Sequence, residues 1–141
     1  MKEPHRMVDV YVSIELTLAA VLPMVCRFFA VAPDEVLLFS HFEERPESDW
    51  LKVKVWGFVR STDGGDFLSS VHLFTQVDQQ VDEAEFARHL ARELNCACLI
   101  TDDDVNPYTM LYIDASQRYR VALDVKRLDD HEMVIARKME S

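Results

Sequence analysis

The sequence predicts an α+β fold, in which a mostly antiparallel sheet has two helices packed against it. Three observations lead to this prediction: apolar residues alternate with period two near the N-terminus, a helix with clear start and stop signals lies in the middle, and short polar links join the later strands. Strands joined by such short links run antiparallel, because parallel pairs need long crossovers. The predicted order is β-α-β-β-β-α-β-β-β-β, in a single domain over residues 1–141.

The N-terminal part is predicted to form a strand followed by a helix. Apolar residues occupy every second position from Val8 to Leu16, as in a strand with one buried face. A helix follows over Leu18–Ala32, and Pro33 ends it. Pro23 leaves two alternatives, because a proline ring clashes with the preceding helical turn: the helix begins near Pro23, or it is kinked there.

Three strands are predicted between residues 35 and 77. The first, Glu35–Phe42, leads into an acidic loop over Glu43–Asp49, and the second covers Trp50–Arg60. The turn Asp63–Gly65 contains two consecutive glycines, which predicts a hairpin to the third strand, Phe67–Val77.

The two faces of the strand Trp50–Arg60 differ in composition. One face is apolar and contains Leu51, Val53, Val55 and Val59. The other mixes aromatic and basic side chains, namely Trp50, Lys52, Lys54, Trp56, Phe58 and Arg60. Such a mixture is typical of a nucleic-acid platform, but the net charge contradicts that function. Two alternatives remain: a helix covers this face, or the face is open and its tryptophans anchor a protein partner.

The second helix has the clearest signals in the chain. Asp82 can cap its N-terminus, and Glu85 stands three residues later, as in a capping box. Asn95 suits a left-handed C-terminal stop. The residues expected to face the core repeat at helical spacing and are Phe86, Leu90 and Leu94.

The C-terminal part is predicted to be a meander of four strands. They cover Cys96–Thr101, Tyr108–Ile113, Arg118–Lys126 and Glu132–Lys138. In the third of them we expect inward-facing side chains at Tyr119, Val121, Leu123 and Val125.

Charge and cysteine content limit the classes of function. Fifteen basic residues oppose 25 acidic ones, and this formal net charge of −10 disfavours nucleic acid and favours a basic protein partner. Simple solubility is the alternative explanation of the charge. No run of residues is long and apolar enough for a membrane span, so no membrane partner is expected. Three cysteines without disulfide spacing predict a reducing, cytoplasmic location, with Cys96 and Cys98 packed on one face of a strand rather than binding metal.

Three consecutive aspartates follow the strand that ends at Thr101. Carboxylates at a strand end can bind Mg²⁺ or Ca²⁺, but the glycine and ligand spacing of a calcium-binding loop are absent. The alternatives are a solvated turn, in which the side chains cap their own backbone, and a protein-binding surface. These residues are Asp102, Asp103 and Asp104.

No motif for catalysis or for a cofactor is present in the sequence. The five histidines are scattered without the spacing of a zinc site, and there is neither a nucleophile motif nor a phosphate-binding glycine loop. We therefore expect a protein that is not an enzyme and that uses no cofactor or metal.

The C-terminal part shows a pattern of predicted strands and acidic turns over residues 96–114, Val121–Asp124 and Leu128–Glu132. In this pattern the segments resemble the C-terminal half of small immunity proteins that bacteria encode beside polymorphic toxins of the contact-dependent inhibition or Rhs type. The resemblance implies a cytoplasmic, non-catalytic protein that occludes a cognate toxin domain, frequently a basic nuclease. It assigns no individual binding residue.

Charge and aromatic content then indicate which residues bind the partner. Basic active sites hold phosphate, and acidic residues can mimic that charge. The expected partner-binding residues are Glu43, Glu44, Glu47, Asp49, Trp50, Trp56, Asp102, Asp103 and Asp104. Two other functions remain open: a small acidic secretion chaperone that binds an effector segment, and a domain that binds a metal or small ligand through Asp102–Asp104.

Overall fold

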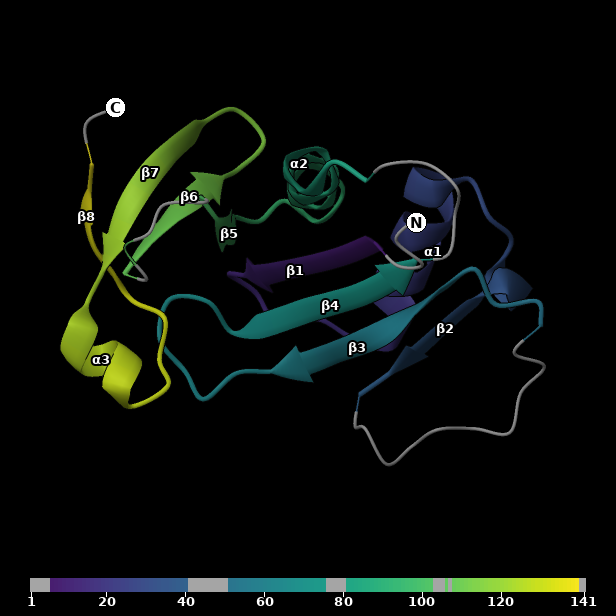
Figure 1. The fold of residues 1–141 in the computed structure, drawn as a ribbon, viewed down its shortest axis with the longest axis horizontal. Coiled ribbons are helices and arrows are strands. Elements are labelled where there is room, and N and C mark those ends of the chain that lie inside the picture. Colours follow the sequence, from purple (N-terminus) through teal and green to yellow (C-terminus); the bar gives the residue numbers. More distant parts are fainter. Residues whose placement is uncertain (1–5, 41–50, 76–80, 103–105, 107, 140–141) are drawn as a thin grey trace, which may run out of the picture.

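A single sheet organises the structure, a computed structural model that describes residues 6–40, 51–75, 81–102, 106 and 108–139. Within these residues the strands follow the order β2-β3-β4-β1-β5-β6-β7-β8 across the sheet (Figure 1). The strands are β1 (Arg6–Val12), β2 (Val36–Phe39), β3 (Val55–Ser61), β4 (Ser69–Thr75), β5 (Cys98–Thr101), β6 (Thr109–Ile113), β7 (Arg118–Leu123) and β8 (Ile135–Lys138). The helices are α1 (Leu18–Phe29), the short 3-10 helix η1 (Pro33–Glu35), α2 (Glu83–Leu94) and α3 (Val125–Asp129).

The predicted α+β class is confirmed. All neighbouring strands pair antiparallel except β2 and β3, which run parallel. Fifteen residues connect β2 to β3, a link long enough to return the chain to the same edge. No helix in the described ranges is long and apolar enough to span a bilayer.

The main core lies between one face of the sheet and the helices α1 and α2. The predicted alternation on β1 is confirmed, since Val8, Val10 and Val12 are each fully buried on this face. They contact the buried side of both helices, including Met24 of α1 and Phe86 of α2. Figure 1 shows α1 behind the arrowhead of β4, so the opposite face of the sheet points toward the viewer there.

Helix α1 begins at Leu18, which excludes the alternative that it begins near Pro23. The Thr17 hydroxyl accepts the Ala20 N–H at 3.1 Å and caps the N-terminus, and Pro23 then lies inside the helix. The helix ends at Phe29, earlier than predicted, because Ala30 adopts a left-handed conformation with φ of 56°. Pro33 instead starts η1.

Helix α2 forms where its signals predicted. The Asp82 carboxylate accepts the N–H groups of Ala84 and Glu85 at 3.0 and 3.2 Å, and Asn95 closes the C-terminus with φ of 53°. Two of the three predicted core residues, Phe86 and Leu90, are fully buried, and Leu94 is half-buried against the same core.

The predicted strand Arg118–Lys126 is too long by three residues. It ends at Leu123, because the Asp124 carboxylate accepts the Arg127 N–H and caps the short helix α3. Val125, expected to face inward, is 44% exposed as a result.

A second, smaller core lies on the opposite face of β5, β6 and β7. It contains Phe67, Leu99, Met110, Val121, Leu123 and Met133. The segment after α3 closes over it, held by a backbone bridge between Gly65 and Met133. Beyond it, β8 forms one edge of the sheet and carries the exposed Arg137 and Lys138.

The strand predicted over Trp50–Arg60 begins only at Val55. Residues 51–54 form a turn instead, and Leu51, expected on the apolar face, is 97% exposed. From Val55 onward the predicted alternation holds, with Val55 and Val59 buried and Trp56 and Phe58 on the other side.

Strands β1 and β5 form the narrowest junction in the sheet. They pair at only two positions, Tyr11 with Leu99 and Val12 with Cys98. The next hydrogen-bonded position in this register would be Asp9 with Thr101. The Asp9 N–H donates instead to the Glu83 carboxylate of α2 at 2.9 Å, so the strands separate there.

Replacing Phe86 with Ala is expected to lower the free energy of unfolding by about 3–5 kcal/mol, because it leaves a cavity between α2 and the sheet. Leu51→Ala is the control, since its exposed side chain is expected to contribute less than about 0.5 kcal/mol. Urea denaturation of both variants measures the difference. Equal stability of the two variants would contradict the packing of α2.

Candidate functional site

The face of β2, β3, β4 and β1 opposite α1 and α2 carries three rows of aligned side chains. The cross-strand register builds each row from neighbouring strands. The first row is Leu37, Trp56, Phe74 and Met7; the second is Phe39, Phe58, His72 and Asp9; the third is Arg60, Ser70 and Tyr11. We call these residues the aromatic face.

Ring contacts hold the centre of the aromatic face together. The Trp56 ring stacks on Phe74 with centroids 4.4 Å apart, and the His72 ring lies 4.9 Å from Phe74. The Arg60 guanidinium lies over the Phe58 ring at 4.7 Å. Because these rings support one another, the centre of the aromatic face is a stiff apolar surface. Phe39, at the β2 end of the second row, is only 2% exposed and adds little to this surface.

The polar side of the aromatic face is formed by Asp9, His72 and Tyr11. The Asp9 carboxylate lies 3.9 Å from Nδ1 of His72, and both side chains are more than a third exposed. Burial, and then the Asp9 charge, raise the pKa of the Tyr11 hydroxyl, which therefore stays protonated at neutral pH. This side offers a carboxylate acceptor, an imidazole ring and a hydroxyl to a partner.

No described helix covers the aromatic face. The buried sides of α1 and α2 contact the other face of the sheet, and α3 lies beside β7 and β8 (Figure 1). Trp56 is half-buried within the aromatic face, and Met7 at its margin is 57% exposed. Of the two alternatives for Trp56, the covering helix is therefore not found among the described residues.

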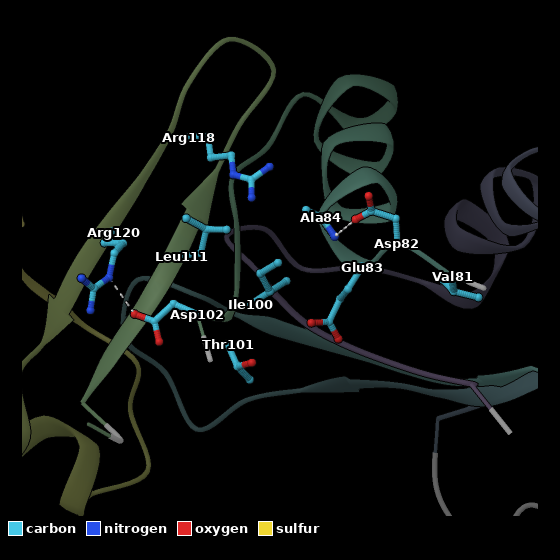
Figure 2. Close-up of a pocket in the computed structure, with 10 residues that line it drawn as sticks. All are labelled: Val81, Asp82, Glu83, Ala84, Ile100, Thr101, Asp102, Leu111, Arg118 and Arg120. Carbon is cyan, nitrogen blue, oxygen red and sulfur yellow. Dashed lines mark hydrogen bonds and ion pairs between the residues drawn. The ribbon is translucent and has the colours of Figure 1, made fainter. Parts of the chain in front are cut away.

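A second surface is the pocket between α2 and strands β5, β6 and β7, with a volume of about 560 Å³. Figure 2 shows Arg118 and Arg120 on the β7 side and Asp82 and Glu83 on the α2 side. Between them lie Ile100, Thr101, Asp102 and Leu111, with Val81 and Ala84 at the helix end. The pocket lies beside the junction at which β5 separates from β1.

Asp102 lies in this pocket and not in a solvated turn. Its side chain is only 5% exposed, and it accepts the Nε–H of Arg120 at 3.0 Å. Asp102 and Trp56 also lie on opposite faces of the sheet, with β4 and β1 between their strands. The two described members of the predicted partner-binding set therefore cannot contact one compact partner surface together.

The other predicted partner-binding residues lie outside the described residues. They are Glu43, Glu44, Glu47, Asp49, Trp50, Asp103 and Asp104. In the described part of the chain, no three His, Cys, Asp or Glu side chains are grouped as a metal site requires.

The predicted packing of Cys96 and Cys98 against the core is confirmed. Both thiols are free and donate to α2, Cys98 to the Ala87 carbonyl at 3.6 Å and Cys96 to the Leu90 carbonyl at 3.9 Å. The neighbouring Cys96 sulfur, and then burial, raise the pKa of Cys98, so this thiol stays protonated.

Sequence reasoning missed most of both surfaces. His72 and Phe74 gain their importance from pairing with β3 and β1, which no local pattern specifies. The sequence pattern places Arg118 and Arg120 on the side of their predicted strand opposite Tyr119 and Val121, and it indicates no site for them. Their spacing of two, opposite a carboxylate at the end of β5, is the signal that could have indicated a pocket.

In comparisons with known proteins, the chain matches no family model, no curated protein and no solved structure.

Replacing Asp102 with Lys is expected to destabilise the protein by about 3 kcal/mol, because it places two cations together at a nearly buried site. The matched control is Asp129→Lys in the exposed end of α3, which is expected to change stability by less than about 0.5 kcal/mol. Chemical denaturation of the two variants tests this difference. Similar midpoints and slopes would show that the ion pair with Arg120 is unimportant for folding.

Proposed function

We propose that this protein is a non-catalytic immunity protein that binds and neutralises a basic toxin domain. The observation that carries the proposal is the aromatic face, on which Trp56 and Phe74 stack beside Phe58 and Arg60. Tryptophan and arginine are the residues that most often dominate binding energy at protein interfaces. Exposed apolar clusters rimmed by polar residues mark interaction sites, and the tryptophan and arginine of this cluster favour a protein partner.

The charge of the chain supports a basic partner. A net charge of −10 attracts a cationic domain and speeds its encounter with this protein. Acidic residues also occur in the connection between β2 and β3, the two strands that carry Leu37, Phe39, Trp56 and Phe58. In this proposal the aromatic face supplies the contact area, and the acidic residues steer the partner toward it.

The partner to test is the C-terminal domain of the protein that the adjacent gene encodes. Growing cells that express this domain should survive when the wild-type protein is coexpressed, and the two purified proteins should form a complex. If growth is not rescued and no complex forms, the immunity proposal is wrong. A stable dimer that holds an unfolded effector segment would favour the chaperone instead.

Replacing Trp56 and Phe74 together with Ala is expected to weaken the complex about thirtyfold or more, because it removes two central aromatic contacts. The matched control replaces Tyr112 and Tyr119 with Ala. These two residues form a stacked pair on β6 and β7, with ring centroids 4.6 Å apart. Calorimetric titration of both folded variants measures the change in affinity. Equal weakening by the two double variants would remove the aromatic face from the proposal.

Reversing the charge of Glu43 and Glu47 to Lys is expected to slow association about tenfold at low salt and to flatten its salt dependence. Replacing Asp129 and Asp130 with Lys changes the net charge equally at α3, on the opposite side of Figure 1 from β2. Stopped-flow association rates at several salt concentrations compare the two variants. The same slowing in both would show that only the net charge steers the partner.

A further inference from the structure

Two cysteines on the short link from α2 into β5 point to the same core (Figure 1). Cys96 and Cys98 both pack against the core beneath α2, whereas Ala97 between them packs against the second core on the opposite face. The Cys98 thiol donates to the Ala87 carbonyl at 3.6 Å. One helical turn further along, the Leu90 carbonyl accepts the Cys96 thiol at 3.9 Å. The two thiols therefore lie side by side under one helix.

Hydrogen bonds hold the backbone of this link in place. The Cys96 N–H donates to the Ala91 carbonyl at 3.1 Å. The Ala97 N–H donates to the Ser13 hydroxyl at 2.9 Å, and the Ala97 carbonyl accepts the Ser13 N–H at the same distance. Cys98 is the first residue of β5. The fold thus fixes where the two sulfur atoms lie relative to each other.

The two thiols differ in exposure and in acidity. Cys98 is fully buried, whereas Cys96 is half-buried and follows the exposed Asn95. The Cys98 thiol lowers the pKa of Cys96, against the opposing effect of burial. The thiolate therefore forms at the cysteine that solvent reaches. The third cysteine, Cys26 of α1, is also half-buried, but burial raises its pKa.

We propose that Cys96 and Cys98 form a reversible disulfide when hydrogen peroxide reaches the protein. The Cys96 thiolate attacks one peroxide oxygen, the O–O bond breaks, and the other oxygen leaves as hydroxide, which takes up the thiol proton to form water. The Cys98 sulfur then attacks the sulfur of the Cys96 sulfenic acid, and its own proton leaves with the hydroxyl group as a second water. The dithiol loses two electrons, and the peroxide is reduced to water.

The bridge is expected to be strained and therefore easily reduced. Residues two apart in an extended segment have Cα atoms about 6–7 Å apart, at the upper end of the range that a disulfide spans. Strained disulfides have higher reduction potentials and are the labile ones. Oxidation also removes both thiol donors from the carbonyls of α2. The bridge is thus a reversible modification at the end of α2 and not a permanent link.

Differential alkylation of the intact, folded chain tests this modification. After peroxide treatment, free thiols are blocked with iodoacetamide in denaturant, and the oxidised thiols are then reduced and labelled with N-ethylmaleimide. Trypsin cleavage after Arg92 and Arg118 isolates one peptide with both Cys96 and Cys98, and Cys26 lies on another. Both thiols of the first peptide should gain the maleimide label together, whereas Cys26 should not. Dithiothreitol added before the block should abolish the label.

The variants Cys96→Ala and Cys98→Ala separate the roles of the two thiols. In Cys98→Ala the reaction should stop at the Cys96 sulfenic acid, which dimedone traps. Cys96→Ala should lose both the maleimide label and the dimedone adduct, because the buried Cys98 does not react with peroxide. Cys26→Ala is the matched control and should form the bridge as the wild type does. Circular dichroism checks that each variant is folded.

The proposal is overturned if the bridge forms only in chain that has been unfolded in urea, a comparison that needs the wild type alone. It is equally overturned if iodoacetamide still blocks both thiols after peroxide treatment of the folded protein. Label that appears only in disulfide-linked dimers, or a dimedone adduct on Cys98 in place of Cys96, would also contradict it.

Discussion

The structure depends on the burial of three valines at the centre of the sheet. Val8, Val10 and Val12 place β1 under both long helices, and β4 and β5 join it on either side. Because side chains alternate on a strand, the same residues that bury one face direct Asp9 and Tyr11 to the other. One strand therefore supports the helical layer and the polar side of the aromatic face. A shift of its register by one residue would disrupt both.

Local signals in the sequence predicted most helices and strands, but they did not predict which strands pair with one another. The alternation on β1 and the caps Asp82 and Asn95 act within a few residues, so they could be read directly from the sequence. The helix α3 was missed although its cap is also local, because Val121, Leu123 and Val125 continue the strand pattern past Asp124. The parallel pairing of β2 with β3 and the narrow β1–β5 junction depend on distant parts of the chain, which no local pattern reports.

In the candidate sites too, features set by a local pattern could be predicted, and contacts between distant parts of the chain could not. Trp56 was correctly placed on a face distinct from the valines of its strand, since alternation decides that alone. Phe74 stacks on Trp56 because β3 pairs with β4, and Asp102 is nearly buried because it contacts Arg120. Neither contact could be predicted from a local pattern. The runs of acidic residues were the strongest feature of the sequence. In the described structure the carboxylates of Asp102, Glu83 and Asp82 accept internal hydrogen bonds instead of forming one acidic surface.

The strand β8 has a consequence for the behaviour of the protein at high concentration. An edge strand presents a row of backbone hydrogen-bonding groups to which a second copy could add its own sheet. Arg137 and Lys138 lie on this edge, and the Lys138 ammonium is held over the Tyr119 ring at 4.4 Å. Two copies meeting edge to edge would bring these cations together, and the repulsion opposes fibre-like growth from this side of the molecule.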